Sequence, residues 1–123
     1  MELTFLGKET AEGDSPTLYA TDRGSYIVQG WKLTPGRAPW TSAPDGRLDV
    51  EIYTRLLNHL SKDGVPGRLG PLKPPVVGTT GPDTCIVRGS VVTDRTARAR
   101  MAIPDHEDCV EVPAAHLKAL FRE

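Results

Sequence analysis

Residues 26–34 read YIVQGWKLT, and residues 85–93 read CIVRGSVVT. The two stretches share isoleucine, valine, glycine and threonine at the same places, at an offset of 59 residues. One added residue raises the offset to 60, and the match then continues from Val-Glu-Ile at 50–52 to Val-Glu-Val at 110–112. Such a colinear series of matches indicates an internal duplication.

Each repeat is expected to form a β-β-(β)-α unit. The β-branched runs 25–34 and 84–93 predict the first strand of each copy. Residues 96–103 alternate apolar residues with arginine and predict a second strand, which prolines interrupt in the first copy. The short strands 49–52 and 109–112 then lead to the helices.

The helices predicted at 53–62 and 113–121 rest on leucine spacing. Leu57 and Leu60 recur as Leu117 and Leu120, and these residues lie on one apolar helix face. We expect both leucine faces to pack on a shared sheet, because helices this short gain stability mainly from packing. His59 and His116 are expected on the opposite, outer faces.

Glycines interrupt both first strands. Gly30 and Gly89 hold equivalent places in the two copies. A glycine inside a strand indicates a bulge or a close approach of another backbone.

These elements predict one α+β domain over residues 1–123, with an antiparallel or mixed sheet, two short helices and a pseudo-two-fold axis. Repeat one covers about 17–62, a Pro/Gly-rich linker covers 63–83, and repeat two covers about 84–123. Residues 3–6 and 17–20 are expected to be short strands. The polar segment 7–15 between them is expected to be mobile.

The composition is that of an ordinary globular domain. The chain has 123 residues, 38% hydrophobic and 25% charged, with a net charge of −1. This balance argues against disorder and against binding a polyanion by bulk charge. No apolar run is long enough for a transmembrane helix, and the first residues lack the pattern of a signal peptide. We therefore expect a soluble, cytoplasmic protein that does not interact with membranes.

The chain shows few signals of catalytic or metal chemistry. Cys85 and Cys109 lie in apolar runs, so we expect reduced, buried thiols. His106 and Cys109 are too few for a metal site. No nucleophile elbow or phosphate loop occurs. We expect no metal and no cofactor.

The candidate binding residues are four arginines and two tryptophans. An anion-binding strand face would contain Arg98 and Arg100, joined by Arg88 and Arg95; the alternative is a solvated face with acidic neighbours. Trp40 in its Pro-rich segment is either an interface residue or a cap on the core, and Trp31 marks a difference between the repeats.

Three stretches near the N-terminus carry a family resemblance. Residues 15–23, reading SPTLYATDR, and residues 3–8 and 26–32 resemble a family of small uncharacterised actinomycete proteins encoded beside helix-turn-helix regulators. The resemblance implies a genomic neighbourhood and no activity. Residues 110–117 are also similar to the strand-Pro-helix entry of AbrB-type transcription factors.

Three functions remain open. The first is a non-enzymatic interaction or accessory protein, with a transcriptional regulator or a biosynthetic complex as its protein partner. The second is a small-molecule binder or minor enzyme with its site between the two repeats, where ligand pockets often form. The third, and least favoured, is a nucleic-acid binder that uses the arginine strand face.

Overall fold

A computed structural model describes residues 1–9, 16–34 and 36–123. Most of the segment 7–15, for which we expected mobility, lies outside the described residues. The strands expected at 3–6 and 17–20 are confirmed as β1 (Leu3–Lys8) and β2 (Thr17–Thr21).

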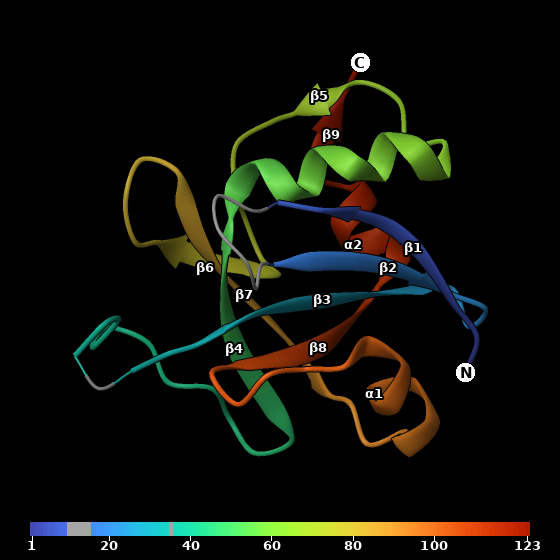
Figure 1. Cartoon of the computed structure of the whole chain (residues 1–123). Coiled ribbons are helices and arrows are strands. Elements are labelled where there is room, and N and C mark those ends of the chain that lie inside the picture. Colours follow the sequence, from blue (N-terminus) through green and yellow to red (C-terminus); the bar gives the residue numbers. More distant parts are fainter. Residues whose placement is uncertain (10–15, 35) are drawn as a thin grey trace.

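An antiparallel sheet forms the body of the protein (Figure 1). Its order is β1, β2, β3 (Ser25–Lys32), β4 (Arg47–Tyr53), β7 (Thr84–Val91) and β6 (Val76–Thr79). Strand β8 (Glu107–Pro113) pairs with both β3 and β7. Strands β3, β4, β7 and β8 therefore form a closed circuit of paired strands. The predicted α+β class with an antiparallel sheet is confirmed.

The two longest pairings join the N-terminal and C-terminal halves of the chain. Strand β3 pairs with β8 from Ser25–Pro113 to Trp31–Glu107, and β4 pairs with β7 along its whole length. By contrast, β3 pairs with β4 at only two positions, and β7 likewise pairs with β8 at only two. The two longest strand ladders of the protein therefore run between the halves.

Both helices predicted from the leucine spacing are present. The 3-10 helix η1 (Thr54–Asp63) follows β4 and ends at Gly64, which has a positive φ of 80°. Helix α2 (Ala114–Lys118) follows β8 and is shorter than predicted. Beyond it, β9 (Phe121–Arg122) pairs with β5 (Arg68–Leu69) in a small second sheet. None of the helices in the described part of the chain is long and apolar enough to cross a membrane.

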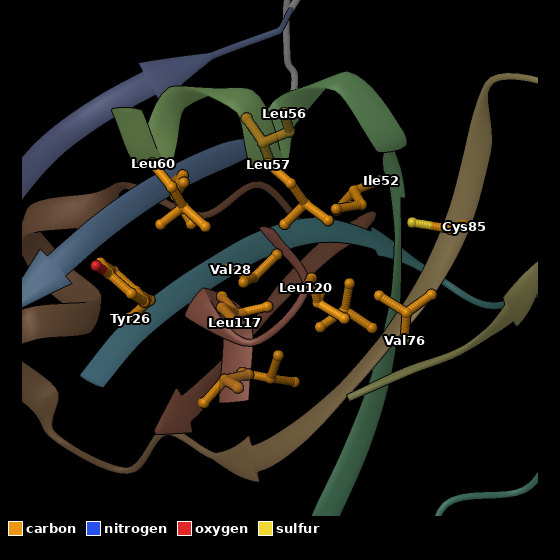
Figure 2. Close-up of a cluster of buried hydrophobic side chains, with 14 of the residues drawn as sticks. Tyr26, Val28, Ile52, Leu56, Leu57, Leu60, Val76, Cys85, Leu117 and Leu120 are labelled. Atoms are coloured by element: carbon orange, nitrogen blue, oxygen red, sulfur yellow. The ribbon is translucent and has the colours of Figure 1, made fainter. Parts of the chain in front are cut away.

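The leucine faces of both helices meet in one core (Figure 2). Leu57 and Leu117 are fully buried, as are the valines Val28 and Val87 from the inner face of the circuit. A smaller cluster around Ile27 and Cys109 lies on the opposite face of the sheet, because successive strand residues point to opposite sides.

The prediction of a strand at 96–103 is wrong. These residues belong mainly to helix α1 (Arg95–Met101), where Asp94 Oδ1 accepts the backbone N–H of Ala97 at 2.9 Å as an N-cap. Ala97 and Met101 are buried one helical turn apart, whereas Ala99 is exposed. The alternation of alanine and arginine thus fits a helix whose start is fixed by Asp94.

The close backbone approach expected at the strand glycines is confirmed. A Cβ on Gly30 would lie 2.5 Å from the carbonyl oxygen of Glu51, and one on Gly89 would lie 2.7 Å from that of Glu111. Neighbouring strands pass within van der Waals contact at both positions, which leaves no room for a side chain.

Two further expectations need correction. The predicted linker 63–83 contributes β5 and β6, so part of it belongs to the sheets. His59 is not on an open outer face, because its Nε2 lies 2.7 Å from Glu9 Oε2 and its side chain is only 21% exposed. His116 is exposed as expected.

The matched leucines generate a stability prediction. Leu57→Ala and Leu117→Ala should each lower the free energy of unfolding by about 2–4 kcal/mol, because each leaves a cavity in the same core. His116→Ala, the exposed control, should change it by less than about 0.5 kcal/mol. Urea unfolding measures all three. A loss confined to one leucine would contradict a shared core.

Candidate functional site

A groove of about 750 Å³ opens on the outer face of the circuit, where β3 leaves β2 and meets β4. The N-terminal half supplies its aromatic and aliphatic wall: Trp31, Leu33 and Tyr53. The C-terminal half contributes Thr84 and His106. The groove therefore lies at the junction at which the sequence predicted a small-molecule site.

The aromatic wall is built from two adjacent strands. Trp31 of β3 and Tyr53 of β4 meet edge to face, with ring centroids 5.0 Å apart and planes at 83°. The guanidinium of Arg55 lies over the Tyr53 ring, 4.2 Å from its centroid. This cation–π contact helps to hold the ring in place. Trp31 is partly exposed and can offer ring surface to a planar group.

Buried carboxylates flank Trp31 on both sides. Trp31 is opposite Glu51 of β4 and opposite Glu107 of β8, and opposite residues in antiparallel strands share one face. Glu51 is 6% exposed and Glu107 is 2% exposed. Carboxylates this buried need charge or hydrogen-bond partners.

Arg37 and Thr80 bind the first carboxylate. Arg37 donates from Nη2 to Glu51 Oε2 at 2.7 Å and from Nε to Oε1 at 3.1 Å. The Thr80 hydroxyl donates to Oε2 at 2.5 Å. The bonds to Glu51 raise the pKa of Arg37. The guanidinium is half exposed at the groove, and its Nη1 has no hydrogen-bond partner within the part of the chain described.

Gln29 binds the second carboxylate, and His106 lies beside it. Gln29 Nε2 donates to Glu107 Oε1 at 3.0 Å, and His106 Nε2 lies 3.4 Å from Glu107 Oε2. The His106 side chain is 56% exposed, so it links the buried carboxylate to the groove. Both carboxylates are thus hydrogen-bonded within the protein. Basic side chains, Arg37 and His106, lie between them and solvent.

The four arginines predicted as one site do not converge. The strand face proposed for Arg98 and Arg100 does not exist, because both belong to α1. Arg98 pairs with Asp108 at 3.2 Å, and Arg100 pairs with Glu2 at 3.2 Å. Arg95 is exposed at the start of the same helix.

Arg88 is held elsewhere, on β7. Its Nε donates to the buried Asp49 at 2.7 Å, and its Nη2 donates to the Thr41 hydroxyl at 2.7 Å. The hydrogen bond to Asp49 is the main cause that raises the pKa of Arg88. The interpretation of Arg88 as part of an anion-binding face is therefore replaced by an ion pair that joins β4 to β7.

Trp40 lies outside the groove, against the terminal strand β6. A Cβ on Gly78 would fall 2.3 Å from the ring atom Cη2 of Trp40, so the indole rests on this glycine. Trp40 nevertheless remains 54% exposed. The ring thus covers part of β6, and the expected role at an interface stays a prediction.

Sequence reasoning missed the carboxylate pair and the role of Tyr53. Glu51 and Glu107 are 56 positions apart in the chain, and only the strand register brings them to either side of Trp31. No local spacing in the sequence connects His106 to the other residues of the groove. The one sequence-based expectation that bears on the groove is the small-molecule site predicted between the two repeats, because both halves line this groove.

Comparisons with known proteins add no relative. A scan against protein-family models and searches of curated proteins and of solved structures found no match to this chain.

Both thiols are buried, as the apolar runs predicted. Burial raises the pKa of Cys85, and it raises that of Cys109 to about 12. A thiol with a raised pKa and no exposure is a poor nucleophile, because the thiolate is the reactive form.

We therefore expect neither cysteine to react with iodoacetamide in the native protein at about pH 8, and both to react in denaturant. Mass spectrometry of the alkylated protein counts the modified thiols. Rapid alkylation of the native protein would contradict the assignment of both residues to the core.

Proposed function

We propose that this chain binds a small planar organic molecule in the groove beside Trp31. The observation that carries the proposal is the edge-to-face pair of Trp31 and Tyr53 in a 750 Å³ groove, with polar side chains around it. Ligand sites commonly combine an aromatic wall with a few polar groups that orient the ligand. Binding is favoured over catalysis because Glu51 and Glu107 already hold structural partners.

We also propose that the chain is an internal duplication, with repeat one at 17–62 and repeat two extended from 84–123 back to β6. The support is a set of contacts that recur at offsets of 59 and 60. Ile27 is opposite Glu111, as Ile86 is opposite Glu51. Recurring hydrogen bonds join Thr54 N to Asp83 O at 2.9 Å and Ala114 N to Gly24 O at 3.0 Å.

The duplication provides an internal comparison for the groove. On this alignment Trp31 corresponds to Ser90 and Tyr53 corresponds to Pro113. The aromatic wall is therefore a property of one copy, although Glu51 has a counterpart in Glu111. A binding site in one copy of a duplicated scaffold needs such a local difference.

The binding proposal is tested with indole as a neutral planar probe. We expect saturable binding with a Kd of about 1 mM, the range for a fragment of this size, and a shift of the Trp31 indole N–H signal in NMR spectra. Trp31→Ser, which copies Ser90, should weaken binding by at least about tenfold. Trp40→Ala is the matched control and should leave the affinity unchanged.

Two results would contradict the proposal. One is the absence of saturable binding by the wild-type protein. The other is an affinity that Trp31→Ser leaves intact while the variant still unfolds cooperatively in urea.

The exposed ring of Trp40 favours a second candidate function, binding to a protein partner. The ring is 54% exposed beside β6, the terminal strand of the sheet, and exposed aromatics are enriched at interfaces. The partner would be the transcriptional regulator or biosynthetic complex expected from the sequence.

Affinity capture with wild-type protein and Trp40→Ala in parallel tests this second function. A macromolecule that binds the wild-type chain should be lost from the variant, because the anchor ring is gone. Capture of the same macromolecules by both proteins would contradict a role for Trp40.

A further inference from the structure

The groove is lined by one carboxylate, Glu51, and by three basic side chains, Lys32, Arg37 and His106. Glu51 and Glu107 are buried and bonded to Arg37, Thr80 and Gln29. Of these residues, Glu51 and Arg37 line the groove, so a ligand meets the Glu51 carboxylate already paired with the Arg37 guanidinium.

The exposed polar groups at the groove are mainly cations or hydrogen-bond donors. Lys32 is exposed at the end of β3 and has no ion-pair partner among residues 1–9, 16–34 and 36–123. Arg37 uses Nε and Nη2 on Glu51, so its Nη1 donors can meet a ligand. His106 lines the same groove beside Glu107.

On the basis of the proposed function, we propose that the groove is selective for planar aromatic anions, with an aromatic carboxylate as the ligand class. The ring of the ligand lies against Trp31, and its carboxylate accepts hydrogen bonds from Lys32 and Arg37. Hydrogen bonds between charged partners are stronger than neutral ones, and Arg–carboxylate pairs add directionality. The anionic group thus supplies selectivity, and the aromatic wall supplies contact area.

The opposite charge preference has a structural argument against it. Two carboxylates beside a tryptophan could attract an organic cation, as in aromatic cages. Here Arg37 neutralises Glu51 at 2.7 Å, and Lys32 adds an exposed positive charge that has no ion-pair partner in the described part of the chain. A cation would have to displace Arg37 from Glu51 or stay close to two like charges.

The test compares naphthylacetate, naphthylacetamide and naphthylmethylamine, which share the ring and carry an anionic, neutral or cationic group. Binding is measured by NMR in the Trp40→Phe background, in which the indole N–H signal of Trp31 stands alone. We expect naphthylacetate to bind at least about tenfold more tightly than the amide, and the amine to bind most weakly. Added salt should weaken the binding of the anion and leave that of the amide nearly unchanged.

Lys32→Gln should reduce the preference for the anion over the amide several-fold. The matched control is Lys8→Gln, an exposed lysine on β1 that does not line the groove; it should leave the preference unchanged. Both substitutions are at exposed sites, so folding is expected to survive.

The outcomes distinguish a failure of the anion preference from a failure of the proposed binding function. Equal affinity for all three compounds, with the Trp31 signal shifted, would overturn the anion preference and keep the binding site. Tightest binding of the amine would also overturn it and would assign specificity to the carboxylates. Binding by none of the three would overturn the proposed function together with its selectivity.

Discussion

The crossed pairing of strands between the two halves of the chain is the constraint on which the rest of the structure depends. Strand β3 runs along β8, and β4 runs along β7 (Figure 1), so the two longest strand ladders join the halves. One core follows, to which Leu57 from the middle of the sequence and Leu117 from near its end both contribute (Figure 2).

The groove is a consequence of the same crossing. Trp31 is the residue at which β3, still paired with β8, also begins to pair with β4. It is therefore opposite Glu107 on one side and Glu51 on the other. The basic side chains beside these carboxylates come from irregular segments at the rim, Arg37 from one half and His106 from the other. Strand pairing thus places the aromatic wall, and the buried carboxylates account for the basic side chains at the rim.

Local patterns predicted the core and failed to predict the site. The spacing of Leu57 and Leu117 identified both helix faces, and Gly30 and Gly89 marked the close approach of strands, because both signals depend on neighbouring residues. The alternating segment at 96–103 was misread as a strand, since its pattern fits either period and only the Asp94 cap favours the helix. The pairing of Trp31 with Glu51 and Glu107 depends on strand register across the whole chain, which no local pattern encodes.

Native-state hydrogen exchange tests the interlocking of the halves most directly. The amides of β3 and β8 should open with the same free energy as those of β4 and β7, and that value should equal the global free energy of unfolding from urea. Val28 and Val87, both fully buried, are suitable reporters. A lower opening free energy throughout one half, with the other half still protected, would show that the halves unfold separately and would contradict a single interlocked core.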